Sequence, residues 1–229
     1  MILIQHTMSA QSRFVRLLLA EHDIDAELAD ERPWERRPEF LQVNPAGTLP
    51  VLYAEANTPI CGYYAIAEYL DETRGIMLRD RRLMPEYPLD RAEARRLTDW
   101  FMVKFDADVT RVLVRERVFK LEMPADRGGG APDSGAMRAS RANIKQHIAY
   151  INWLAGTRNW LTGGKLTIAD FAAAGAISIL DYLGELDWRD APHARDWYGR
   201  MKSRPSFRPI LSERVRGLQP ASHYADLDF

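Results

Sequence analysis

Hydrophobic positions along the chain follow two different patterns, one in its first third and one in the rest. In the first third, short apolar runs at 1–5, 26–29 and 50–53 are typical of strands. Between the first two runs the apolar residues recur at helical spacing, and a second helical segment is predicted at 65–72. The order strand, helix, strand, loop, strand, strand, helix predicts a small α/β domain over residues 1–76.

The remaining two thirds of the chain carry only helical spacing. Residues 77–89 hold two prolines and a cluster of charges, which indicates a linker. Residues 90–229 are predicted to form an all-helical domain that ends in a polar, aromatic tail. A glycine-rich insert at 127–135 interrupts the helices, and its composition favours mobility. The strongest helical signal is an apolar stripe that repeats every four residues, namely Leu97, Phe101, Phe105, Val109 and Leu113.

A capping motif marks the start of one helix in the second part. Thr167 and Asp170 have the spacing of a capping box, with Asp in place of the usual Glu or Gln. The apolar run FAAAGAISILDYL follows directly. We therefore assign these two residues a structural role.

Composition and charge narrow the classes of function. The 229 residues are 46% hydrophobic, which is enough for a sizeable core. A net charge of -1 argues against a protein that binds nucleic acid by a basic excess. No stretch of about 20 apolar residues is present to span a bilayer, and the first residues do not resemble a signal peptide. We expect a soluble, cytoplasmic protein without a metal site, membrane insertion or a nucleic-acid partner.

Cys61 is the single cysteine of the chain, so an intramolecular disulfide is excluded. A reducing compartment suits such a chain. Cys61 lies at the end of a predicted strand, and we expect a core side chain there rather than a reactive thiol.

Four segments resemble the glutathione transferase superfamily. They are SAQSRFVRLLLAEHDI, NPAGTLPVL, AIAEYLDE and LTIADFAAAG, and together they cover nearly the whole chain. The resemblance implies a thioredoxin-like first domain packed on an all-helical second domain, usually as a homodimer. It implies less about activity, because function belongs to sites and not to folds.

The resemblance also assigns candidate positions for glutathione. A transferase uses a hydroxyl or thiol at the start of the first helix to favour the thiolate, and Ser9 matches this position, with Ser12 as the second candidate. The alternative is that both serines only cap the helix. Leu49-Pro50 matches the family's cis-proline step, where backbone groups pair with the cysteinyl unit.

The carboxylate of glutathione is held in the family by Glu-Ser at the start of the third helix, but this chain has Gly62-Tyr63 there. Losing one charge-assisted hydrogen bond costs roughly 1.5–3 kcal/mol, or about 10- to 150-fold in affinity. We therefore expect weak glutathione binding or none. The alternatives are that the alignment shifts by one residue or that other contacts replace the lost ones.

Two segments are not explained by transferase chemistry. ERPWERRPEF places a tryptophan beside arginines in a predicted surface loop, which is typical of a protein-binding hot spot, unless Trp34 docks back onto its own domain. The terminal HYADLDF is either attached to the body by its apolar residues or available to a partner. The candidate partner-binding residues are Trp34, Arg36, Arg37, Tyr224, Asp226 and Asp228.

These segments, together with RNWLTGGKLTIADF and DWYGRMKSRPSFRPILSERV, resemble one branch of the superfamily, the bacterial FzlA-type proteins, which bind the tubulin-like division protein FtsZ. This closer resemblance implies a homodimer that binds and bends FtsZ filaments, with no cofactor and no transferase activity required. The alternative hypothesis is a cytoplasmic glutathione transferase in which Ser9 or Ser12 orients the thiol of bound glutathione.

Overall fold

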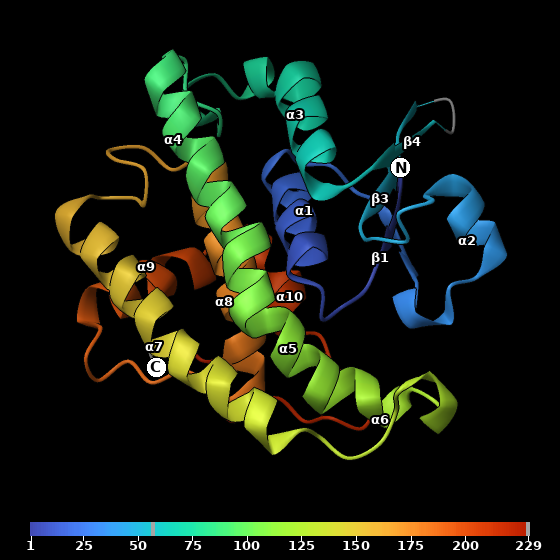
Figure 1. The fold of residues 1–229 in the computed structure, drawn as a ribbon. Coiled ribbons are helices and arrows are strands. Elements are labelled where there is room, and N and C mark those ends of the chain that lie inside the picture. The colour runs from blue at the N-terminus through green and yellow to red at the C-terminus, as the bar shows by residue number, and fades with distance from the viewer. Residues whose placement is uncertain (56–57, 228–229) are drawn as a thin grey trace.

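A four-stranded mixed sheet forms the first part of the chain in the computed structural model, which describes residues 1–55 and 58–227 (Figure 1). The order of the strands is β2-β1-β3-β4. β1 and β2 are parallel, because α1 crosses over between them, whereas β3 and β4 are antiparallel to their neighbours. The strands are β1 (Ile2–Gln5), β2 (Glu27–Asp30), β3 (Val51–Tyr53) and β4 (Pro59–Cys61).

Helices cover both faces of this sheet. α1 (Ala10–Glu21) and α3 (Tyr63–Arg74) lie on one face, and the short α2 (Pro38–Val43) lies on the other (Figure 1). α1 is buried along most of its length, because α8 packs against it from the second part of the chain. The sheet is therefore joined to the helical part through α1.

The connection between the two parts starts as a continuation of α3. The turns of η3 (Gly75–Arg81) follow α3 directly, and α4 begins at Pro88. Arg82 holds the buried carboxylate of Asp71 in α3 through two hydrogen bonds of 2.8 and 2.7 Å. The carbonyl of Leu83 then accepts a hydrogen bond from the first backbone N–H of α8. The connection is thus attached to both parts.

One continuous helical rod carries the predicted apolar stripe. It includes wider, π-helical turns, and all five stripe residues from Leu97 to Leu113 are fully buried, which confirms the predicted long helix. The glycine-rich insert follows this rod, and Asp133 at its end caps the next helix, α7. The segments of the rod and its neighbour are α4 (Pro88–Asp99), η4 (Trp100–Thr110), α5 (Arg111–Val114), η5 (Arg115–Phe119), α6 (Lys120–Glu122), η6 (Ala125–Arg127) and α7 (Ser134–Thr157).

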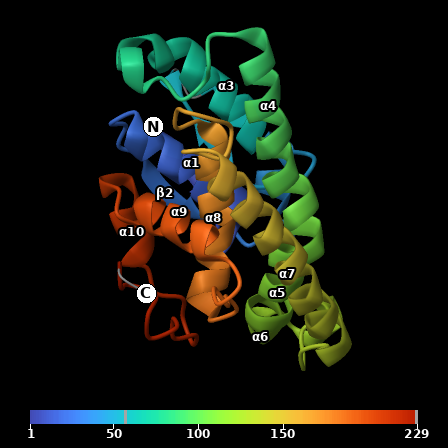
Figure 2. The same cartoon turned by 90° about the vertical axis from the view of Figure 1, so that its left-hand side faces the viewer.

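α8 (Ile168–Leu183) is the central helix of the second part, and every one of its residues is buried (Figure 2). The capping box forms at its start: Thr167 and Asp170 exchange side-chain and backbone hydrogen bonds. No helix among the described residues is long and apolar enough to cross a membrane. The chain continues through α9 (Pro192–Lys202), η7 (Pro205–Phe207) and α10 (Arg208–Leu211).

Candidate functional site

The register of the sheet brings the three candidate glutathione segments together. Ile4 pairs with Val51, and Val51 pairs with Cys61, so the end of β1, the start of β3 and the end of β4 lie at the same edge. Ser9, Leu49-Pro50 and Gly62-Tyr63 flank these residues in sequence. We refer to Ser9, Leu49-Pro50 and Gly62-Tyr63 as the α1–α3 corner.

The hydroxyl of Ser9 caps α1. It accepts a hydrogen bond from the backbone N–H of Ser12 (3.2 Å) and donates one to Oε1 of Gln11 (3.3 Å). Ser12, the second candidate, is fully buried, and its hydroxyl accepts from the backbone N–H of His6. Ser9 therefore lies within reach of the surface but is already hydrogen-bonded, while Ser12 has no access to a ligand.

The peptide bond between Leu49 and Pro50 is cis. The carbonyl of Pro50 accepts a hydrogen bond of 3.0 Å from the backbone N–H of Gly62. One donor at the start of α3 is therefore used within the corner. Leu49 itself is buried.

Gly62 and Tyr63 make the corner unlike an anion site. Gly62 has φ 92° and ψ 142°, a conformation that a glutamate would adopt only with strain. The ring of Tyr63 is half-buried and lies 6.2 Å from that of Phe14. Burial raises the pKa of the Tyr63 phenol, and the negative charges of Asp99 and Asp106 raise it further. The carboxylate of a ligand placed in the corner would be repelled by the same two aspartates, Asp99 and Asp106.

Next to the corner, on the other side of the β1–α1 turn, lies a cleft of about 510 Å³ that contains His6 and Thr7. We call it the η1 cleft, because η1 (Pro33–Glu35) forms one of its walls. The residues of that wall and its surroundings are Asp30, Arg32, Glu35, Arg37 and Glu122, and Arg214, Val215 and Arg216 form a second wall.

An aromatic cluster lies beside this cleft. The ring centroid of Phe119, in η5, is 4.5 Å from that of Trp34 and 5.0 Å from that of His6. Trp34 is partly exposed, so it docks against the helical part of the chain and still offers one edge to the surface. Burial lowers the pKa of His6, Asp30 opposes this, and Arg32 and Arg13 add to it, which leaves the pKa at about 4. His6 is therefore neutral near pH 7.

The two arginines of the loop after η1 differ in their contacts. Arg37 forms an ion pair with Glu31, a buried carboxylate, and the side-chain hydrogen bonds with Glu31 raise the pKa of Arg37. Arg36 is exposed and has a left-handed backbone with φ 47°. Arg37 lines the cleft, whereas Arg36 lies next to it in sequence.

The structure corrects the position expected for Tyr224. The side chain is 1% exposed, its hydroxyl donates to the carbonyl of Ile210 (3.0 Å), and its ring packs edge-on against that of Tyr182. Tyr224 therefore fixes the tail to the body and presents no surface to a partner. Asp226 is exposed, and Asp228 lies outside the described residues.

The expected core position of Cys61 is wrong, because the side chain is exposed. β4 is a three-residue edge strand, in which alternate side chains point to opposite faces. Ile60 takes the inward position in this strand, and Pro59 and Cys61 point outward. Burial raises the pKa of the Cys61 thiol, so the cysteine is exposed without being activated.

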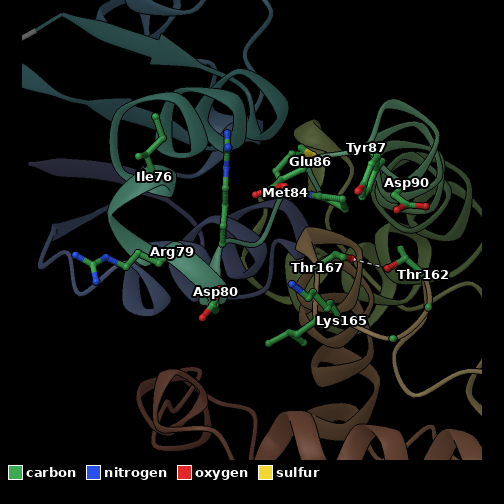
Figure 3. A pocket seen from close by; sticks show the side chains of 15 residues that line it. Ile76, Arg79, Asp80, Met84, Glu86, Tyr87, Asp90, Thr162, Lys165 and Thr167 are labelled. Atoms are coloured by element: carbon green, nitrogen blue, oxygen red, sulfur yellow. Dashed lines mark hydrogen bonds between the residues drawn. The ribbon is translucent and has the colours of Figure 1, made fainter.

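A larger hollow of about 800 Å³ is lined by none of the corner residues (Figure 3). Its walls come from the connection at 76–90 and the loop before α8, at 162–167. Acidic, basic and apolar side chains alternate along it, and the guanidinium of Arg79 points away from Lys165 and Glu86 (Figure 3). Of the predicted site residues that the structure describes, only Thr167 lines this hollow. No group of acidic, histidine or cysteine side chains placed to hold a metal ion occurs in the described parts of the chain.

Comparison with known proteins places this architecture in a family. Residues 8–73 match the family model of the glutathione S-transferase N-terminal domain, and residues 134–200 match that of the C-terminal domain. The chain therefore belongs to the glutathione S-transferase family. The predicted fold class, a thioredoxin-like α/β domain with an all-helical domain, is confirmed.

Individual relatives cover nearly the whole chain. FtsZ-localized protein A of Caulobacter vibrioides is 43% identical over 221 residues, which are 95% of this chain and 93% of that protein. The solved structure of FzlA from C. crescentus is 42% identical with a TM-score of 0.90, and covers 100% of this chain and 99% of that one. A structure described as a glutathione S-transferase from Sinorhizobium meliloti is 62% identical with a TM-score of 0.98, at the same coverage. The predicted resemblance to FzlA-type proteins is thus confirmed.

Sequence reasoning missed several residues of the η1 cleft. His6, Arg214 and Arg216 of the cleft, and Phe119 beside it, come from separate segments that meet only in the folded chain. His6 carried one signal, since it directly follows the first predicted strand, where polar residues often reach a site. The others had no local pattern that would single them out.

Proposed function

We propose that this protein is a homodimeric scaffold that binds FtsZ filaments through the η1 cleft, and that it acts without transferase chemistry. The observation that carries the proposal is the likeness, over nearly the whole chain, to a protein whose name places it with FtsZ. Of the candidate partner residues, Arg37 lines this cleft, Trp34 packs against the cleft residue His6, and Arg36 precedes Arg37 in sequence. A partly exposed tryptophan among arginines is the composition that dominates binding energy in protein interfaces.

The geometry of the α1–α3 corner supports a scaffold rather than a transferase. Ser9 uses its hydroxyl for the cap of α1 and for Gln11. Gly62 uses its N–H for Pro50, and Tyr63 occupies the space where the family places a small hydroxyl. A bound tripeptide would have to break these contacts before it gained its own.

A homodimer belongs to the proposal because two copies of the cleft on one particle would bridge or bend a filament through avidity. Exposed apolar side chains on three helices, Tyr64 of α3, Val103 of η4 and Trp153 of α7, give surface for a second copy to cover. The equilibrium mass in solution, measured by sedimentation equilibrium, tests this part, and a monomer at micromolar concentration would contradict it.

Co-sedimentation with polymerised FtsZ tests the proposed function. The wild-type protein is expected to pellet with filaments and to saturate. Deletion of residues 222–229 is expected to weaken pelleting, because it removes Asp226 together with the buried Tyr224 that fixes the tail. The smaller change Asp226→Asn separates a surface contact from loss of the tail anchor. Absence of wild-type protein from the pellet under polymerising conditions would contradict the proposal.

A second candidate function is glutathione conjugation. The observation that favours it is the match to a structure described as a glutathione S-transferase, together with Ser9 at the expected position. This function requires saturable glutathione binding and turnover of an electrophilic aromatic substrate that is lost in Ser9→Ala. Turnover that survives in Ser9→Ala would remove Ser9 from the account.

A further inference from the structure

The wall of the η1 cleft formed by Arg214, Val215 and Arg216, which we call the strap, is fixed at both ends. The backbone N–H of Val215 donates to the hydroxyl of Tyr182 (2.9 Å), and that hydroxyl donates to the carbonyl of Leu218 (2.8 Å). Leu218 also returns a backbone hydrogen bond to Val215. The strap is therefore part of a hydrogen-bonded turn, and Tyr182 of the buried helix α8 holds this turn in place.

The residue before the strap is held by two arginines of α1. Glu213 forms an ion pair with Arg16 and lies 3.7 Å from Nη2 of the fully buried Arg13. The Nε of Arg13 also donates to the carbonyl of Thr7 (2.8 Å), and Thr7 lines the same cleft. One buried guanidinium thus contacts both the β1–α1 turn, at Thr7, and the residue before the strap, Glu213.

The charges on the two walls are balanced differently. On the η1 wall, Arg32 lies 3.4 Å from carboxylate oxygens of both Glu35 and Glu122, and Arg37 pairs with Glu31. These cations already have carboxylate partners, and His6 beside them is neutral near pH 7 because burial lowers its pKa to about 4.

The strap carries the cations without carboxylate partners. The guanidinium of Arg214 donates only to the backbone carbonyls of Leu211 and Glu213. Arg216 is exposed and makes no hydrogen bond or ion pair with any residue in the described ranges. Two positively charged side chains therefore line the cleft. Tyr182 holds the backbone between them, and both side chains are exposed to solvent.

We propose that the strap recognises a carboxylate-rich segment of the partner, with Arg216 and Arg214 as the recognition residues. Guanidinium groups bind carboxylates through paired hydrogen bonds, and a fixed backbone lowers the entropy cost of that pairing. Trp34 is partly exposed beside the cleft, with its ring centroid 5.7 Å from that of the cleft residue His6, and suits an apolar side chain beside the carboxylates. The identification of the partner as FtsZ rests on the proposed function. The prediction that the bound segment is rich in carboxylates does not depend on it.

Charge reversal at a single exposed position tests the proposal. Arg216→Glu is expected to weaken co-sedimentation with FtsZ filaments at least about tenfold, since it removes one charge-assisted pair and adds repulsion. Arg208→Glu is the matched control, because Arg208 is exposed on the nearby helix α10 and has no ion pair within the described residues. Equal unfolding temperatures of both variants and the wild type would show that the fold is kept.

A binding assay without FtsZ separates this inference from the proposed function. A fluorescent octaglutamate peptide is titrated into the wild type, Arg216→Glu and Arg208→Glu, and its anisotropy is followed, with octalysine as the opposite-charge probe. We expect binding of octaglutamate to the wild type and to Arg208→Glu only. If these peptides behave as expected but no variant pellets with filaments, the acidic-segment site stands and the FtsZ proposal fails. If the wild type pellets and both charge reversals pellet equally well, the strap proposal is overturned.

Discussion

The α1–α3 corner and the η1 cleft lie on either side of the same short turn, residues 6–9, and they use their polar groups in opposite ways. In the corner, Ser9 and Gly62 are hydrogen-bonded to the chain itself. In the cleft, Arg214 and Arg216 have no carboxylate partner within the described residues. A family resemblance directs attention to the corner, but the groups that remain available for binding are in the cleft.

This difference bears on which region of a shared fold is available to a ligand. Binding needs donors and charges whose partners come from outside, because a group that is already satisfied must lose one interaction to gain another. The cis peptide bond and the capped helix start shape the corner whether or not a ligand is present. The comparison therefore predicts different outcomes for changes in the two regions.

The largest expected effect concerns α8, the buried helix that packs against α1. Asp170 is fully buried and accepts hydrogen bonds from the backbone of Leu161 and Thr167 and from Nε1 of Trp197. Asp170→Ala leaves three buried donors without a partner, and we expect a loss of at least about 3 kcal/mol in the free energy of unfolding. Chemical denaturation measures it, with Asp133→Ala at the exposed cap of α7 as a control that should lose less.

The second effect concerns His6, which lies between the two regions. The folded pKa of about 4 lies below the ordinary value of 6.5, so the folded chain binds fewer protons than the unfolded chain between these values. The stabilisation is complete above pH 6.5 and is lost as the pH falls toward 4, by up to about 3 kcal/mol.

Denaturation of the wild type and of His6→Asn as a function of pH measures this contribution. The amide oxygen of Asn can replace Nδ1 of His6 as the acceptor for the N–H of Met8. The difference in unfolding free energy between the two proteins should shrink between pH 6.5 and 4. A difference that stays constant over this range would show that His6 is not held in its neutral form.

The third effect concerns Trp34, and it tests whether the partner binds at the cleft. Trp34→Ala removes the exposed edge and its contact with Phe119, and we expect a loss of filament binding of about 2 kcal/mol, or roughly 30-fold. Trp160→Ala is the control, since Trp160 is also partly exposed and does not line the cleft. Equal losses in both variants would mean that the cleft is not the binding surface.

The smallest effect belongs to the corner. Ser9→Ala removes the cap of α1, and the cost in stability should be about 1 kcal/mol. Filament binding should stay unchanged, because Ser9 does not line the cleft. Co-sedimentation and thermal unfolding of the same preparation separate the two results, and a large loss of binding with little loss of stability would connect the corner to the partner.

The sequence predicted the features that depend on local patterns. The stripe from Leu97 to Leu113 and the capping box at Thr167 and Asp170 are repeats or spacings within one helix, and the folded chain contains both. The corner could be located because its segments carry the family resemblance. Their internal hydrogen bonds, such as that from Gly62 to Pro50, depend on the register of the sheet and were not visible.

The features that were missed depend on contacts between distant segments. Tyr224 is buried because Arg13 and Tyr182, from two other helices, surround it. Cys61 is exposed because β4 lies at the edge of the sheet, which one strand's sequence does not reveal. The η1 cleft joins parts of the chain separated by about two hundred positions, and only the fold brings His6 next to Arg216.

Calorimetric titration of glutathione into the purified wild-type protein tests the central claim most directly. In the corner, the hydroxyl of Ser9 and the N–H of Gly62 are hydrogen-bonded within the chain, and the ring of Tyr63 is half-buried at the start of α3. The account predicts no saturable heat up to millimolar glutathione. A saturable isotherm with a micromolar dissociation constant, lost on Ser9→Ala, would contradict it.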